Sequence, residues 1–248
     1  MRIRLMIGGM AFLLAGIAAA STGEPSDSLA LTLTLFLHQV LFVFWLGPDI
    51  GVYMWGTKLA NSELSQAQRA AAGRIMRSIE IIPRACMSLM LTVGGVLSEL
   101  MGITHPAWQM VGIWGLGPVW LTLTLLVHFK ATSNPDDPLR KLDGLFRWLV
   151  VATVLGSVGF SLATGRLESV PWLTAKLLLF AAVVYFGIMM RRRLSPVQDA
   201  VVALEKGEGD SALDTEVQHS LSRARIFMFA SWLALAAAAF LGVVQPGS

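Results

Sequence analysis

Hydrophobic residues in this chain are gathered into long segments that are separated by short polar ones. Each long segment holds roughly 20 mostly apolar residues, which is the length that an α-helix needs to cross a bilayer. The pattern predicts an all-α fold, a polytopic transmembrane helical bundle with six or seven spans. The spans that follow the N-terminal segment are expected at about residues 29–56, 85–102, 109–129, 147–164, 172–190 and 225–243.

The N-terminal segment decides between six and seven spans. Residues 1–20 begin with two arginines near Met1, continue with an apolar stretch and end in three alanines. Small residues at that point are typical of a signal-peptide cleavage site, but the segment is also long enough to be a first transmembrane helix. Both interpretations stay open. In either case we expect residues 28–245 to form a single helical membrane domain.

The composition agrees with a membrane protein. Of the 248 residues, 55% are hydrophobic and only 14% are charged, whereas an average soluble domain has about 25% charged residues. The net charge is +3, but the basic residues lie in short loops without a base-reading motif, so we expect lipid and not nucleic acid as a partner. The sequence has no nucleotide-binding glycine loop, zinc spacing or catalytic-triad signature, so any chemistry is expected within the membrane.

The basic residues alternate between successive loops. One set of loops holds nearly all of them, whereas the opposite set holds only Arg166. Because basic loops stay in the cytoplasm, we expect a bacterial-type inner (plasma) membrane protein whose C-terminus lies outside. The polar segments at residues 61–80 and 195–222 are then cytoplasmic connectors. The first is able to form an amphipathic helix, and residues 207–210 should interrupt any helix in the second.

One predicted span carries a polar stripe. Residues 37–49 include His38, Trp45 and Asp49, together with a Gly47-Pro48 step that we expect to break the helix. Offsets of 7 and 11 residues are close to whole helical turns, so His38, Trp45 and Asp49 share one face. Ionisable groups within a membrane are costly and usually mark a protein interior, a cavity or a bound cofactor. His38 is therefore a candidate site residue, and the alternative is a buried histidine that bonds to a neighbouring hydroxyl.

A lysine lies at a comparable depth in another span. Lys176 is several residues inside the membrane from the outer end of the predicted span at residues 172–190. Its four-carbon stem would allow the amine to snorkel to the interface. If it faces inward instead, it could bind an anionic group such as a porphyrin propionate, or act as an axial ligand once it is deprotonated. The shared depth of His38 and Lys176 favours a common site.

A methionine-bearing face provides a different set of ligands. Met87, Met90, Gly94 and Ser98 recur at helical spacing within one predicted span. Thioethers are soft ligands for Cu(I), so Met87 and Met90 are candidate metal ligands together with His38. The alternative is that these methionines fill irregular gaps in the core.

Several short motifs resemble a known superfamily. The spacing of His38, Trp45 and Gly47, and the segment Trp172-Leu173-x-x-Lys176, are similar to the paired histidine and lysine motifs of HemJ-type protoporphyrinogen oxidases. The continuation of the lysine helix into the basic cluster at residues 191–193 is similar to CopD-type copper-resistance membrane proteins. The resemblance implies a helical membrane bundle with a haem, porphyrin or copper site.

Three functional hypotheses follow, and none of them names a catalytic residue. In the first, a b-type haem or porphyrin lies between the helices that carry His38 and Lys176, and electrons pass to or from a lipophilic partner. His38 would then be the axial ligand, Lys176 a second ligand or a propionate partner, and Trp45 a packing wall. In the second, the bundle passes copper from the outer side, and His38, Met87 and Met90 are successive ligands for the metal. In the third, the chain is a structural subunit of a membrane-protein partner. We favour the first because His38 and Lys176 share a depth.

Overall fold

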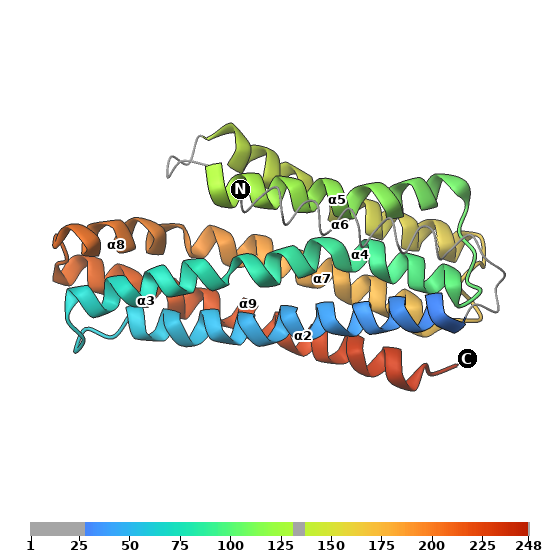
Figure 1. Ribbon diagram of the computed structural model, residues 1–248, viewed down its shortest axis with the longest axis horizontal. Helices are drawn as coiled ribbons and strands as arrows, with labels where there is room; N and C mark the ends of the chain where they lie inside the picture. The colour runs from blue at the N-terminus through green and yellow to red at the C-terminus, as the bar shows by residue number, and fades with distance from the viewer. Residues whose placement is uncertain (1–27, 131–136, 248) are drawn as a thin grey trace. The chain divides into compact units, whose positions relative to one another are not determined.

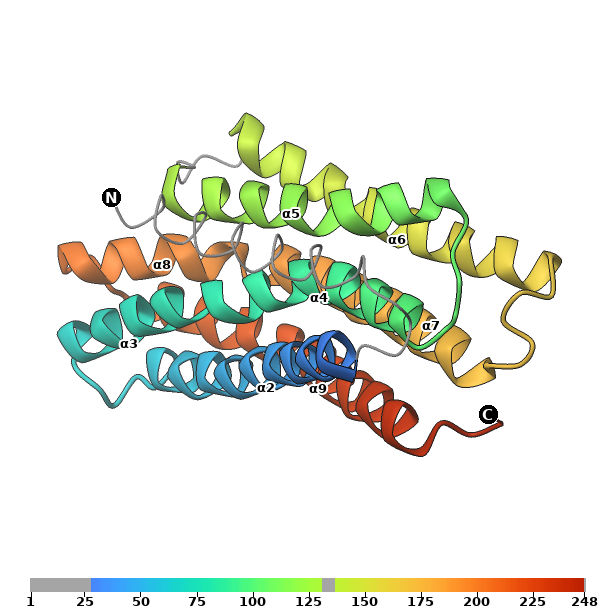
Figure 2. The same ribbon diagram turned by 45° about the vertical axis from the view of Figure 1, so that its right-hand side comes forward.

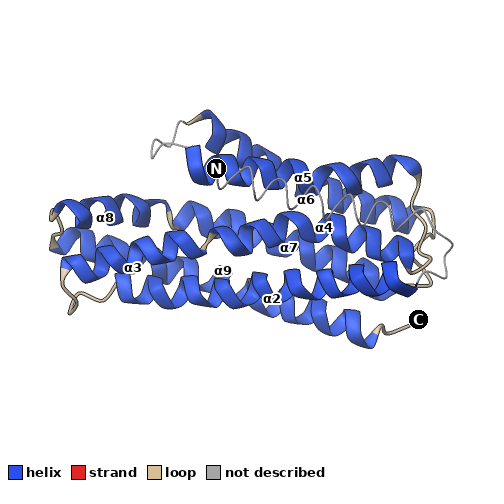
Figure 3. Ribbon diagram, viewed as in Figure 1, coloured by secondary structure: helices blue, strands red, loops and turns tan. Residues whose placement is uncertain are grey.

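The structure is a computed structural model in which residues 28–130 and 137–247 are described (Figure 1). All regular secondary structure within these ranges is α-helical (Figure 3). Six helical segments there are long and apolar enough to cross a membrane, and each corresponds to one of the predicted spans. The predicted all-α polytopic transmembrane bundle is therefore confirmed, whereas the predicted segment at residues 1–20 lies outside the described residues. The helices are α2 (Ser28–Leu59), α3 (Gln66–Ile79), α4 (Ile81–Leu100), α5 (Ala107–Lys130), α6 (Pro138–Ala163), α7 (Pro171–Arg193), α8 (Ser195–Lys206) and α9 (Ser211–Val244).

Helix α2 continues through the Gly47-Pro48 step, so the break expected there is wrong. Proline lacks an N–H and removes one intrahelical hydrogen bond, which costs about 3 kcal/mol in the interior of a soluble helix. Membrane helices tolerate such residues, because neighbouring groups and small local adjustments satisfy the freed carbonyl. The long apolar segment therefore stays helical despite Pro48. Pro118 likewise lies inside helix α5.

The described helices fall into two compact units. The first unit contains residues 28–49 of α2 together with α4 and α5. The second unit contains residues 50–59 of α2 together with α3, α6, α7, α8 and α9. The single domain expected over residues 28–245 stays a prediction.

Helices α4 and α5 of the first unit pack closely because small residues lie between them. A Cβ added at Gly95 of α4 would lie 2.6 Å from the Ile113 side chain, and one added at Gly117 of α5 would collide with Thr92. The Thr92 hydroxyl also donates a hydrogen bond to the Ile113 carbonyl. Glycine and small hydroxylated residues allow such close approach in membranes, where lipid supplies no hydrophobic force between helices.

In the second unit, helix α7 packs against both α6 and α9 (Figure 2). A buried carboxylate joins α6 to α7. The Asp143 carboxylate accepts hydrogen bonds from Arg147 Nε at 3.0 Å and from Arg191 Nη1 at 2.9 Å. Because Asp143 and Arg147 are almost completely buried, each needs the other to offset the loss of water.

The segments expected to be connectors form a hydrophobic core in this unit. Helices α3 and α8 pack on one another and on the beginning of α9, at the end of α2. Gly73 of α3 leaves room for the Val201 side chain of α8. We call these buried residues the connector core. The segments connect the spans, as expected, and they also pack on one another. The connector core consists of Leu59, Ala70, Ala72, Met76, Val197, Ala200, Val201, Leu204 and Val217.

Two local predictions about these segments are confirmed. An amphipathic helix, α3, forms within residues 61–80. Residues 207–210 interrupt the helix in the second segment: α8 ends at Lys206, and Gly207 has a left-handed φ of +78° that favours glycine. The Asp210 side chain then caps α9 by accepting a hydrogen bond from the Leu213 N–H at 2.7 Å.

A buried arginine holds the connector core together. The Arg69 Nε of α3 donates a hydrogen bond to the Leu59 carbonyl at the end of α2, at 2.9 Å. Its Nη2 lies 2.6 Å from Asp214 Oδ1 on α9, and the Arg69 side chain is only 4% exposed. One guanidinium group therefore links three helices.

Candidate functional site

His38 lies in the first unit, where its ring is packed against helix α4. A Cβ added at Gly94 would lie 3.2 Å from Cε1 and 3.6 Å from Nδ1 of the imidazole. The ring is half-buried, and the absence of a side chain at Gly94 lets it approach the α4 backbone. The predicted inward orientation of His38 is consistent with this contact.

The face of α4 that meets His38 is the one that carries the candidate methionines. Met87 and Met90 precede Gly94 by about two turns and one turn of the helix, so they share its face. Both methionine side chains are buried, with exposed fractions of 6% and 8%. The structure therefore brings His38 to the same α4 face as both predicted copper ligands.

Trp45 continues the buried side of α2. It lies two turns beyond His38 and is 5% exposed, while Thr34 and Leu41 on the same side of the helix are also buried. Apolar residues on the other side, including Phe36 and Val43, are exposed. The face predicted from the spacing of His38 and Trp45 is thus the inward face of the helix.

Lys176 lies in the second unit, in the second turn of α7. Its amine is directed at helix α9, where Nζ would lie 2.6 Å from a Cβ added at Gly242. It also lies 5.7 Å from the ring centroid of Trp172, which is a cation–π distance. Among the described residues, no carboxylate forms an ion pair with Lys176.

The two halves of the predicted haem site belong to different units. His38 is described with α4 and α5, whereas Lys176 is described with α7 and α9. Each residue contacts a glycine on a neighbouring helix of its own unit, and their pairing stays a prediction. Among the described residues, no group of three or more His, Cys, Asp and Glu side chains forms a metal site.

A polar cluster in the loop between α4 and α5 was not singled out from the sequence. His105 Nδ1 lies 2.7 Å from Glu99 Oε2, and the His105 backbone N–H donates to the same oxygen at 2.9 Å. Ser98 Oγ lies 3.5 Å from the other ring nitrogen. The six-residue separation of Glu99 and His105 crosses the end of α4, so no helical repeat in the sequence relates them.

The fold and these placements define a multi-pass α-helical membrane protein in which His38 and Lys176 each contact a neighbouring helix and Met87 and Met90 are buried. Comparison of the chain with protein-family models, curated proteins and solved structures finds no match.

Proposed function

We propose that this chain binds a b-type haem or porphyrin at an intramembrane site made from His38 and Lys176, for electron transfer or for the oxidation of a lipophilic substrate. The observation that carries the proposal is the setting of Lys176. Its amine lies against α9 at Gly242 and has no carboxylate partner among the described residues. A cation inside a bilayer is costly unless it meets an opposite charge, and a porphyrin propionate would supply that charge.

The side chains fit a porphyrin in chemical type. An imidazole such as His38 is a common axial ligand of haem iron, and an amine such as Lys176 can pair with a propionate or act as a second ligand. Both lie over glycines, at Gly94 and Gly242, where a Cβ would press on them. A b-type haem supplies one-electron chemistry when bound, and the axial ligand, burial and nearby hydrogen bonds tune its potential. Trp45 is our candidate for a packing wall.

The alternative is a structural role for Lys176, and the test must distinguish this role from haem binding. Gly242 belongs to the last turn of α9, which ends at Val244. The C-terminal end of a helix carries partial negative charge, and a cation there gains about 0.3–1 kcal/mol. This interaction would hold the amine on α9 without any ligand.

The test is an absorption spectrum of the purified protein, oxidised and then reduced with dithionite. We expect a Soret band and reduced α and β bands that are lost in His38→Ala and weakened in Lys176→Met, while Lys176→Arg keeps part of the signal. His219→Ala is the matched control, because His219 is an exposed histidine on α9. A colourless wild-type protein, or equal loss in the control, would overturn the proposal.

Copper handling is a second candidate because His38 meets the α4 face that carries Met87 and Met90. A histidine and two thioethers are suitable donors for Cu(I), although buried methionines also serve as adaptable core residues. On this hypothesis, metal analysis of the colourless wild-type protein finds copper, and Met87→Leu with Met90→Leu removes it. Met54→Leu is the control, since Met54 is 58% exposed on α2. A colourless protein without copper would favour a structural subunit.

The proposed setting is a bacterial-type inner membrane, with membrane lipid around the spans and a redox or membrane-protein partner. The alternation of basic loops supports this topology, with the C-terminus outside. His38 and Lys176 would then both lie nearer the outer face.

A further inference from the structure

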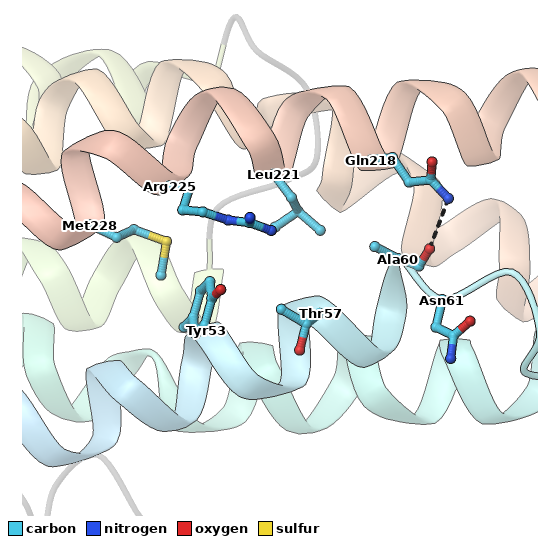
Figure 4. Close-up of a pocket in the computed structure, with 8 residues that line it drawn as sticks. All are labelled: Tyr53, Thr57, Ala60, Asn61, Gln218, Leu221, Arg225 and Met228. Carbon is cyan, nitrogen blue, oxygen red and sulfur yellow. Dashed lines mark hydrogen bonds between the residues drawn. The ribbon is translucent and has the colours of Figure 1, made fainter.

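A small pocket lies within the second unit, where the end of α2 meets α9. Its volume is about 200 Å³, which is below the roughly 300–1,000 Å³ of sites for drug-sized ligands. It is therefore too small for a porphyrin but large enough for a polar head group. In Figure 4, Arg225 extends along the pocket, and the hydrogen bond from Gln218 to the Ala60 carbonyl closes one end. The lining residues are Tyr53, Thr57, Ala60, Asn61, Gln218, Leu221, Arg225 and Met228.

The pocket has the charge and the hydrogen-bond donors of an anion site. Arg225 has no carboxylate partner among the described residues, and its guanidinium carbon lies 5.9 Å from the centroid of the Tyr53 ring. The Asn61 side-chain oxygen accepts from the Glu63 N–H, which leaves its NH2 group available to donate. None of the described residues that line the pocket is acidic. Arginine and amide donors of this kind suit the oxygens of a phosphate.

The end of helix α2 would oppose an anion if its last carbonyls were free, because a helix C-terminus is partly negative. Two of these carbonyls are already hydrogen-bonded to side chains. The Leu59 carbonyl accepts from Arg69 Nε, and the Ala60 carbonyl accepts from Gln218 Nε2. The full positive charge of Arg225 is therefore the dominant electrostatic feature of the pocket.

The pocket lies where the polar part of α9 gives way to its membrane-spanning part. Arg225 is the last charged residue before an apolar run from residue 226 to residue 244. Large apolar side chains are exposed just beyond it, with exposed fractions of 68% at Ile226 and 73% at Leu233 on α9, and 58% at Met54 on α2. A head group at Arg225 would leave acyl chains beside this apolar surface.

From this arrangement we propose that the pocket binds the phosphate head group of an anionic phospholipid, with Arg225 as the main contact and Asn61 and Tyr53 as additional donors. Basic pockets at the ends of transmembrane helices are suited to such head groups. Neither His38 nor Lys176 lines the pocket, and the lipid proposal does not depend on the haem proposal.

The test is native mass spectrometry of the full-length protein in mild detergent, with phosphatidylglycerol or phosphatidylcholine added. We expect the wild-type protein to retain phosphatidylglycerol severalfold better than phosphatidylcholine. Arg225→Gln should abolish this preference, whereas Arg223→Gln should keep it, because Arg223 is an exposed arginine of the same helix that does not line the pocket. Equal loss in both variants, or equal retention of both lipids, would overturn the proposal.

Two further measurements on the wild-type protein keep the proposal testable if Arg225→Gln does not fold. A photoreactive phosphatidylglycerol should cross-link within residues 53–61 and 218–228, and cross-links confined to other segments would overturn the proposed location. In thermal unfolding, phosphatidylglycerol should raise the midpoint and inorganic phosphate should not. Equal stabilisation by inorganic phosphate would mean that free phosphate, and not lipid, is the ligand.

Discussion

The imidazole of His38 lies against Gly94, so that a methyl group at position 94 would come within 3.2 Å of Cε1. That contact identifies the helix that His38 meets, which the spacing of residues along α2 could not predict. His38 faces helix α4 and not lipid, and it does so at the one turn of α4 where the face carrying Met87 and Met90 has no side chain. Gly94 therefore determines how closely the imidazole approaches α4, and through the imidazole it affects the position of any ligand that His38 binds.

Replacing that glycine should disturb ligand binding more than folding. In Gly94→Ala the ring must move by a few tenths of an ångström, since the new Cβ would be closer than ordinary contact. We expect a severalfold fall in bound haem, or in bound copper if the protein carries copper, measured per mole of purified protein. Gly115→Ala is the control, because a Cβ at Gly115 would have nothing within 4 Å. An equal fall in both variants would show that His38 is not responsible.

The membrane spans could be predicted from the sequence because the bilayer imposes a simple requirement. A helix that crosses it needs about 20 apolar residues with few charges, and all six spans among the described residues meet that condition. The inward face of α2 also followed from spacing alone. Trp45 and His38 are seven residues apart, and Trp45 is buried, as their shared face predicts.

Contacts between distant segments could not be predicted in this way. Val201 packs on Gly73, which lies 128 positions earlier (201 minus 73), and nothing local in either segment names the other. Their apolar residues do recur at helical spacing, as at Ala72 and Met76 in α3. That signal predicted an amphipathic helix within residues 61–80, but it did not show which segment the apolar face of this helix would meet. The predicted pairing of His38 with Lys176 is likewise a contact between distant segments, and it stays a prediction.

The connector core should depend on one buried arginine. Arg69→Met removes the guanidinium that bonds to Leu59 and Asp214, and it leaves the Asp214 carboxylate without its cation. Breaking a fully buried pair costs about 3–5 kcal/mol, and this is an upper limit here because the Asp214 side chain is 26% exposed. We expect a large drop in the thermal unfolding midpoint and rapid proteolysis within residues 61–80. Arg74→Met is the control, since Arg74 is 58% exposed and its pair with Glu205 is worth at most about 1 kcal/mol. Similar stability of the two variants would contradict the assignment.

The contact between α6 and α7 should be weakened when the charge of the Asp143 carboxylate is removed. Asp143→Asn keeps the shape of the side chain but removes the charge that faces Arg147 and Arg191. The buried Arg147 and the half-buried Arg191 would then face a neutral amide, and we expect a destabilisation of up to about 3–5 kcal/mol, mostly from Arg147. The measurement is thermal unfolding in detergent. The exposed Asp199 provides the control as Asp199→Asn, which should be nearly neutral. If Asp143→Asn leaves the stability unchanged, the charge of Asp143 is not what holds Arg147 and Arg191 in place.

The topology can be checked with reporter fusions. If the basic loops are cytoplasmic, alkaline phosphatase fused after residue 248 should be active, because it is exported. The same enzyme fused after residue 62, between α2 and α3, should be inactive. Green fluorescent protein should give the reverse pattern at both positions. Activity of the phosphatase at residue 62 would reverse the predicted orientation, and with it the expected depth of His38 and Lys176.

Gly242→Ala distinguishes a ligand-binding lysine from a structural one. The new Cβ would lie 2.6 Å from Lys176 Nζ, so the amine must move away from α9. Because the amine ends a flexible chain, that movement should cost little stability, within about 0.5 kcal/mol as for most exposed substitutions. If Lys176 holds a propionate, the rate of haem loss should nevertheless rise severalfold, measured by transfer to apomyoglobin. If Lys176 only interacts with the end of α9, haem loss should match that of the wild-type protein. Gly187→Ala on α7 is the control, since a Cβ there meets nothing within 4 Å, and a faster loss in that variant too would remove the link to Lys176.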